Sequence, residues 1–315
     1  MPANLTPQYF EAERNFRQAK TTEEKIEALE EMLAVMPKHK GTDHLKADLR
    51  RRIAKLSQAT DKKAATQRAS MLIDKEGAAQ VVIVGPPNVG KSQLVDSVTN
   101  ASPAVAEYPF TTYQAAPAMM PFENIQIQLI DTPPIAEQPM EWWLPHLIRR
   151  ADVVLIVVDL SNEPIDQVET ILDELESKKI FIRENEVKTL IVGNKLDLPG
   201  AADNYQDLKD IYEGQLPVIA ISAKRKVGLE DFKLKLYEVL DIIRVYTKTP
   251  GQKPDMADPI ILQRGNILED AAAAVHKDFA ARLKFARIWG SGKHDGIMAK
   301  RNHILQDGDI IELHL

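Results

Sequence analysis

Residues Gly85 to Ser92 read GPPNVGKS, a pattern that binds the phosphates of a nucleotide. The preceding run Val81–Val84 is short, apolar and β-branched, which predicts a buried strand leading into this loop. Glycine lets backbone N–H groups approach phosphates closely, and the helix that follows points its positive end at the anion. We therefore expect Lys91 to contact the β- and γ-phosphates and the Ser92 hydroxyl to bind Mg²⁺.

Two later segments have the spacing of a guanine site. Asn194-Lys195-Leu196-Asp197 follows the strand-like run Thr189–Gly193, and the Asp197 carboxylate can accept two N–H bonds from guanine. Adenine has no matching pair of donors, which argues against an ATP-using enzyme. Ser222-Ala223-Lys224 follows another apolar run, and we expect the backbone N–H of Ala223 to face guanine O6.

The remaining motifs concern the metal and the γ-phosphate. Asp131-Thr132 follows the strand-like run Ile125–Ile130 and is expected to hold Mg²⁺ through water, while Thr112, within YPFTTY, is expected to close over Mg²⁺ and the γ-phosphate. The predicted nucleotide contacts are Gly85, Asn88, Val89, Gly90, Lys91, Ser92, Gln93, Thr112, Asn194, Lys195, Asp197, Ser222, Ala223 and Lys224. The predicted catalytic residues are Lys91 and Thr112, and the predicted metal residues are Ser92, Thr112 and Asp131.

Composition limits the class of protein. The chain has 315 residues and a net charge of −6. It contains no cysteine, which excludes disulfides and fits a reducing compartment. Its apolar runs are too short to span a bilayer, and the first residues lack a signal-peptide core, so we expect a cytoplasmic protein without membrane attachment. Between Lys38 and Arg68, ten Lys/Arg face three Asp/Glu. This excess could hold phosphates, or it could be a solvated helix face.

Hydrophobic periodicity predicts an α/β protein of three parts. Residues 1–76 carry stripes that include Leu29, Met32 and Leu49, typical of a helical hairpin. Residues 77–246 alternate apolar strands with helical stretches, which predicts a mostly parallel sheet covered on both faces. In residues 247–315, a segment 247–259 reads as a linker or a hairpin loop, and a small mixed α+β module follows.

These motifs resemble the Obg-like branch of the translation-factor-class GTPases, and within it the developmentally regulated GTP-binding proteins. The likeness lies in the NVGKS loop, the YPFTT segment, the helical leader around Pro37–Gly41, and Asn302–Asp309, which looks like part of a TGS domain. It covers nearly the whole chain and implies a P-loop GTPase domain, a ubiquitin-like β-grasp TGS domain, and association with the large ribosomal subunit or another RNA. We expect no counterpart here of the glycine-rich N-terminal domain of true Obg proteins, or of the family's usual insertion in the nucleotide domain.

Two departures bear on mechanism. The family pattern Asp-x-x-Gly reads Asp131-Thr132-Pro133-Pro134, and Pro134 has no N–H to donate to a γ-phosphate. The next residue, Ile135, stands where Ras-like enzymes carry a glutamine that orients water. Similar branches with a hydrophobic residue there rely on K⁺, and Asn88 stands at the position of their K⁺ ligand, although it could equally only shape the loop.

The sequence therefore predicts a slow GTPase that depends on Mg²⁺, with possible stimulation by K⁺, and that acts as a ribosome- or RNA-associated switch. The alternative is a binding scaffold with negligible turnover that senses GTP and GDP, or an alarmone; Pro134 is its best support. The identity of the partner and the oligomeric state are not predicted.

Overall fold

The computed structural model describes residues 73–99, 116–135, 140–141, 143–184, 187–290 and 295–314, with isolated positions between residues 13 and 52. The chain divides into two compact units, Met1–Leu72 and Ile73–Leu315. In the first unit, Leu29, Met32 and Leu49 are helical and buried, while Arg51 and Arg52 are helical and exposed. Most other residues of the predicted hairpin and basic segment, and Thr112, lie outside the described residues.

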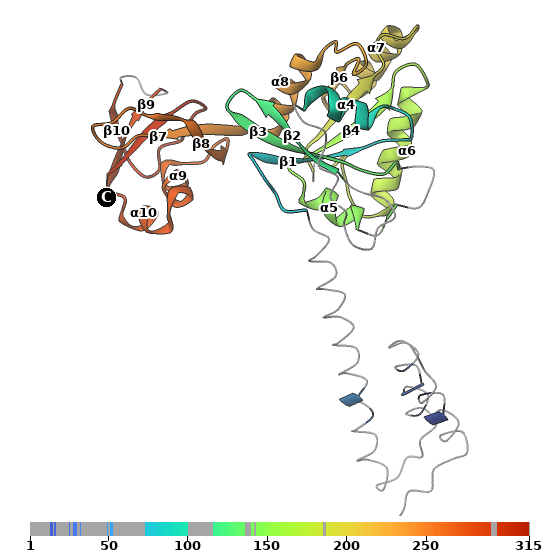
Figure 1. Cartoon of the computed structure of the whole chain (residues 1–315), viewed down its shortest axis with the longest axis horizontal. Coiled ribbons are helices and arrows are strands. Elements are labelled where there is room, and N and C mark those ends of the chain that lie inside the picture. The colour runs from blue at the N-terminus through green and yellow to red at the C-terminus, as the bar shows by residue number, and fades with distance from the viewer. Residues whose placement is uncertain are drawn as a thin grey trace, which may run out of the picture. The chain divides into compact units, whose positions relative to one another are not determined.

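The first sheet of the second unit has six strands, in the order β2-β3-β1-β4-β5-β6 (Figure 1). Its strands are β1 (Ala79–Val84), β2 (Ala116–Phe122), β3 (Ile125–Asp131), β4 (Val153–Asp159), β5 (Thr189–Asn194) and β6 (Val218–Ala220). All neighbours pair in parallel except β2, which is antiparallel to β3. Every residue of β1 is buried, as expected for a strand covered on both faces.

Helices cover both faces of this sheet. On one face, α5 (Leu144–Arg150), α6 (Pro164–Ser177) and α7 (Ala201–Tyr212) pack in a core that includes Val82 and Val84. On the other, α4 (Lys91–Val98) and α8 (Leu229–Leu240) pack in a core that includes Val81 and Ile83. Because side chains alternate along a strand, β1 contributes to both cores. In a sheet of this type, ligands bind beyond the carboxyl ends of the strands.

A second, five-stranded sheet follows, in the order β10-β9-β11-β7-β8. Its elements are β7 (Ile242–Thr247), β8 (Asp255–Gln263), α9 (Leu268–Val275), α10 (Lys277–Arg282), β9 (Phe285–Trp289), β10 (Ile297–Ala299) and β11 (Ile310–His314). β7 is antiparallel to β8 and parallel to β11. Leu268, Ala271 and Ala272 of α9 share a core with Val245 and Ile288 of the sheet.

The junction between the two sheets lies earlier than the predicted boundary at residue 246. α8 ends at Leu240, Asp241 takes a left-handed conformation (φ 54°), and β7 of the second sheet begins at Ile242. The segment 247–259 is therefore no linker between domains: it contains the loop of the β7–β8 hairpin and the first half of β8. Among the described residues, no helix is long and apolar enough to cross a membrane.

Candidate nucleotide-binding site

The loop between β1 and α4 is shaped by close backbone contacts. A Cβ on Gly85 would lie 2.3 Å from the Val157 carbonyl oxygen of β4. Gly90, the N-cap of α4, has φ 93°, and a Cβ there would lie 2.5 Å from Nδ2 of Asn194. Asn88 also has a left-handed backbone (φ 62°), which asparagine tolerates better than most residues. Glycine at positions 85 and 90 is therefore required by the packing of the loop itself.

Lys91 is the first residue of α4, and its side chain lies against the loop. It is 8% exposed, and its Nζ donates to the carbonyl oxygens of Gly85 (3.0 Å) and Pro86 (2.9 Å). Burial lowers the pKa of Lys91, and the charge of Asp131 opposes that shift. An ammonium group held inside the loop by two carbonyls is positioned to meet a phosphate there.

Ser92 and Asp131 come together at the start of α4 and the end of β3. The Ser92 hydroxyl donates to Oδ2 of Asp131 at 2.5 Å. Oδ1 of Asp131 is buried without a hydrogen-bond partner among the residues that the structure describes, and burial raises the pKa of this carboxyl group. A hydroxyl and a carboxylate with an unused oxygen fit the oxygen ligands that Mg²⁺ prefers, so these two residues would hold it, directly or through water.

The residues after Asp131 are anchored to β1 and the phosphate loop. The Thr132 hydroxyl donates to the Ile83 carbonyl oxygen at 2.6 Å, and the Ile135 N–H donates to the Gly85 carbonyl oxygen at 3.0 Å. The Ile135 side chain is 1% exposed and belongs to the core that includes Trp143 and Leu144. This side chain is therefore packed in the core and has no polar group that could orient a water molecule.

On the guanine side, Asn194 joins two loops. Its Nδ2 donates to the Val89 carbonyl oxygen (2.9 Å), and its Oδ1 accepts from the backbone N–H of Ala223 (3.0 Å). The side chain is 1% exposed. The N–H predicted to face guanine O6 is thus engaged with Asn194 here, so its contact with the base stays a prediction. This bridging role was not predicted from the sequence. Gly90 is the residue in the sequence that is related to it, because a Cβ at this position would lie 2.5 Å from Nδ2 of Asn194.

The Asp197 carboxylate is oriented by its neighbours. The Ser222 hydroxyl donates to Oδ1 of Asp197 at 2.6 Å, and Nε of Arg225 lies 3.8 Å from Oδ2. The bond from Ser222 is the main reason that the pKa of Asp197 is lowered. Ser222 in turn accepts from the backbone N–H of Arg225 (3.1 Å), a residue that sequence reasoning did not single out. The carboxylate is thus ionised and ready to accept N–H bonds.

The other predicted contacts lie around these groups. Lys195, with a left-handed backbone, pairs with Asp159 at the end of β4 (2.5 Å). The Val89 side chain is buried in the core, so only its backbone can serve a ligand, whereas Gln93 and Lys224 are exposed. The structure therefore gathers the predicted residues at one edge of the sheet, with Thr112 outside the described residues.

Comparison with known proteins agrees with this geometry. A protein-family model described as a 50S ribosome-binding GTPase matches residues 80–195, and the TGS domain model matches residues 243–315. The chain is 28% identical to an uncharacterized GTP-binding protein of Methanocaldococcus jannaschii, over 92% of each chain. It is 25% identical to the human developmentally-regulated GTP-binding protein 2, over 92% of this chain and 98% of that one.

The archaeal alignment runs over 360 positions, more than the 315 residues of this chain, so that relative carries segments that are missing here. Among solved structures, the YchF GTPase of Schizosaccharomyces pombe is similar with a TM-score of 0.56 and 14% identity, covering 78% of this chain and all of that one. At that identity the likeness concerns the fold, a P-loop GTPase domain joined to further elements. The chain therefore combines a P-loop GTPase domain with a TGS domain, and over most of its length it is similar to developmentally regulated GTP-binding proteins.

Proposed function

We propose that this protein is a slow, Mg²⁺-dependent GTPase that acts as a cytoplasmic switch on the large ribosomal subunit or another RNA-containing partner. The observation that carries the proposal is the joint arrangement of two sites. Lys91 lies against the phosphate loop, Ser92 bonds to Asp131, and Ser222 bonds to Asp197, which supports contacts with phosphates, a divalent ion and guanine. Both sites lie beyond the carboxyl ends of β1, β3 and β5.

Slow turnover is expected from the groups around the γ-phosphate. Phosphoryl transfer depends on positioning and charge stabilisation, and a buried isoleucine at position 135 cannot orient water. Pro134 supplies no N–H. Faster hydrolysis would then need groups from a partner or a bound cation.

K⁺ is the cation that we propose, with Asn88 as a ligand. The left-handed backbone of Asn88 makes Asn88→Gly the suitable variant, because glycine keeps that conformation and removes only the side-chain oxygen. We expect K⁺ to accelerate phosphate release over Na⁺ at equal ionic strength, and Asn88→Gly to abolish the difference. If the variant kept its response to K⁺, Asn88 would only shape the loop.

The ribosomal partner is proposed from the description of the matching family model and from the exposed Arg51 and Arg52 of the basic segment. Co-sedimentation with ribosomal subunits tests it, using the full chain with a non-hydrolysable GTP analogue or with GDP. We expect the protein to pellet with the large subunit only in the analogue. Equal behaviour in both nucleotides would contradict a switch.

The alternative function is a scaffold that senses GTP and GDP, or an alarmone, with negligible hydrolysis, and Pro134 is the observation that favours it. Hydrolysis at background level with K⁺ and ribosomes present, together with competition by guanosine tetraphosphate, would support the scaffold. Multiple-turnover phosphate release that ribosomes stimulate would support the GTPase switch.

A further inference from the structure

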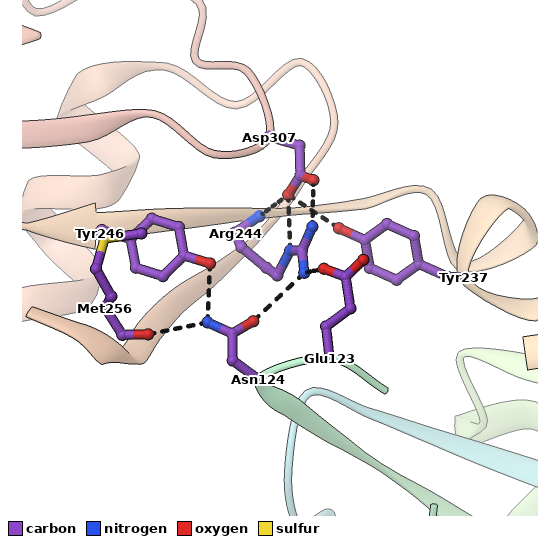
Figure 2. A network of polar contacts seen from close by, with 7 residues as sticks. All are labelled: Glu123, Asn124, Tyr237, Arg244, Tyr246, Met256 and Asp307. Atoms are coloured by element: carbon purple, nitrogen blue, oxygen red, sulfur yellow. Dashed lines mark hydrogen bonds and ion pairs between the residues drawn. The ribbon is translucent and has the colours of Figure 1, made fainter. Parts of the chain in front are cut away.

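The turn that joins β2 to β3 contacts the TGS domain through Arg244 of β7 (Figure 2). On one side, Nη1 of Arg244 forms an ion pair with Glu123 and donates to Oδ1 of Asn124 (3.3 Å). On the other, Nη2 and Nε donate to Oδ2 and Oδ1 of Asp307 at 2.7 and 3.1 Å. We call Glu123, Asn124, Tyr237, Arg244, Tyr246 and Asp307 the Arg244 clamp.

Asn124 adds a second connection between the two domains. Its Nδ2 donates to the Tyr246 hydroxyl (2.8 Å) and to the Met256 carbonyl oxygen (3.1 Å). Both partners belong to the β7–β8 hairpin of the second sheet. The Asn124 side chain therefore uses its donor and its acceptor on groups of the TGS domain, which fixes the turn more strictly than a single charge pair would.

The clamp is also partly withdrawn from solvent. The side chain of Arg244 is 12% exposed and that of Asp307 28%. Tyr237 of α8 donates to Oδ1 of Asp307 (2.9 Å) and stacks on Phe122 of β2, with ring centroids 4.9 Å apart. The hydrogen bonds lower the pKa of Asp307 and raise that of Arg244, so both stay charged at neutral pH. A bidentate pair of this kind gives geometric specificity as well as energy.

The other end of the same hairpin is at the nucleotide site. β2 and β3 pair without interruption from Phe122↔Ile125, beside the turn, to Ala116↔Asp131. Asp131 bonds to Ser92, and Ala116 follows shortly after Thr112 in the sequence. The uninterrupted pairing of β2 with β3 is thus a physical connection between Asp131 and the turn.

The absence of an N–H at Pro134 makes the connection through the β2–β3 hairpin more important for a response to the nucleotide. Since residue 134 has no N–H for the γ-phosphate, Asp131 at the end of β3 is the residue of the hairpin through which a bound ion would act on it. We propose that the β2–β3 hairpin and the Arg244 clamp couple the orientation of the TGS domain to the bound nucleotide. The inference rests on the proposed switch and names the element that carries it.

Coupling of this kind is reciprocal, so loosening the clamp must change the preference for one nucleotide over the other. The first test measures the dissociation constants of fluorescent GDP and of a non-hydrolysable GTP analogue, with Mg²⁺, on the full chain. The variants are Arg244→Lys, which keeps the charge and loses the bidentate geometry, and the milder Asn124→Ala. Arg301→Ala is the matched control, because Arg301 bonds within the TGS domain to Glu269 and the Leu283 carbonyl.

We expect the ratio of the two dissociation constants to shift about fivefold in both clamp variants and to stay unchanged in Arg301→Ala. An equal change in both affinities, or none, would overturn the coupling and leave the clamp a structural contact. If the wild-type chain bound no guanine nucleotide, the proposed function itself would fail, so the two failures are distinguishable.

The second test measures the orientation directly. The chain has no cysteine, so spin labels can be attached at Asp207→Cys on α7 and Ala274→Cys on α9, both exposed. We expect the distance distribution between the labels to differ between GDP and the GTP analogue. In Asn124→Ala, we expect the distributions with the two nucleotides to become more similar. Overlapping distributions in the otherwise wild-type chain, or a difference that survives Asn124→Ala, would overturn the proposal.

Discussion

The guanine side and the γ-phosphate side of the site are built differently. On the guanine side, Asn194 ties together the phosphate loop and the loop of Ala223, and Ser222 orients Asp197. On the γ-phosphate side, Pro134 has no N–H, the Ile135 side chain is buried in the core, and Oδ1 of Asp131 has no partner within the described part of the chain. The polar groups on the guanine side have hydrogen-bond partners within the protein. On the γ-phosphate side, which we call the open side, a backbone N–H is missing and one carboxylate oxygen has no partner in the described part of the chain.

The difference separates specificity from switching. A site whose polar groups are already oriented can discriminate between bases without any partner, because the wrong base offers no matching pair of N–H donors to the Asp197 carboxylate. A site without a backbone N–H at residue 134 has one donor fewer for the γ-phosphate and therefore gains less from the difference between GTP and GDP. We therefore expect strong base selectivity and weak intrinsic discrimination between the two nucleotides.

The largest effect is expected on the guanine side, from Asp197→Asn. The amide can no longer accept both N–H bonds of guanine, and we expect GTP affinity to fall by at least about 1000-fold, while xanthosine triphosphate becomes the preferred ligand. Competition binding measures the change. Asp203→Asn, at an exposed carboxylate in the first turn of α7, is the control. Unchanged GTP affinity in Asp197→Asn would show that another group reads the base.

Asn194→Ala should weaken both nucleotides equally. Its loss leaves the Val89 carbonyl and the Ala223 N–H without their partner, at a cost of about 1–3 kcal/mol each, so we expect dissociation constants to rise about 100-fold. Calorimetry with GDP and a GTP analogue tests this. Asn204→Ala, which removes one bond to the Leu160 carbonyl, is the control. A selective loss of the GTP analogue would contradict the division into two sides.

Ile135→Gln restores the residue type of Ras-like enzymes at a buried position. We expect it to lower the free energy of unfolding by about 2–3 kcal/mol, because an amide replaces an apolar side chain that is 1% exposed. Hydrolysis should not accelerate. Urea unfolding and phosphate release measure the two outcomes, with Ile135→Val as the apolar control at about 1 kcal/mol. A tenfold gain in turnover would mean that this side chain reaches the γ-phosphate.

Pro134→Gly has the smallest expected effect and bears on the open side alone. It supplies an N–H, and one hydrogen bond to a charged phosphate of about 1.5 kcal/mol would raise the preference for the GTP analogue over GDP about tenfold. Binding of the two nucleotides measures it, with Pro133→Gly as the control for backbone flexibility. If the preference stayed the same, the missing N–H would not be the reason for weak discrimination.

Local features of the sequence predicted the parts of the fold that local physics decides. The apolar run before Gly85 and the polar residues after each strand were enough to predict β1, β5 and the edge of the sheet where the site lies. Long-range contacts were not accessible in this way. The role of Asn194 depends on the loop of Ala223, and the Arg244 clamp joins residues more than a hundred positions apart in the sequence.

The junction at residue 242 shows another limit of prediction from the sequence: the composition of a segment does not decide its structure. The segment 247–259, rich in Pro, Lys and Asp, is equally compatible with a linker and a hairpin loop, and only its pairing with β7 decides between them. β10 escaped prediction because it is three residues long and its pairing with β9 defines it.

Wild-type dissociation constants for GDP, a non-hydrolysable GTP analogue and ATP, measured with Mg²⁺ present, test the difference between the two sides of the site. We expect both guanine nucleotides to bind within about tenfold of each other and ATP to show no measurable binding. Binding of ATP comparable to that of GTP would contradict the guanine side. A preference of more than about 100-fold for the GTP analogue would contradict the open γ-phosphate side.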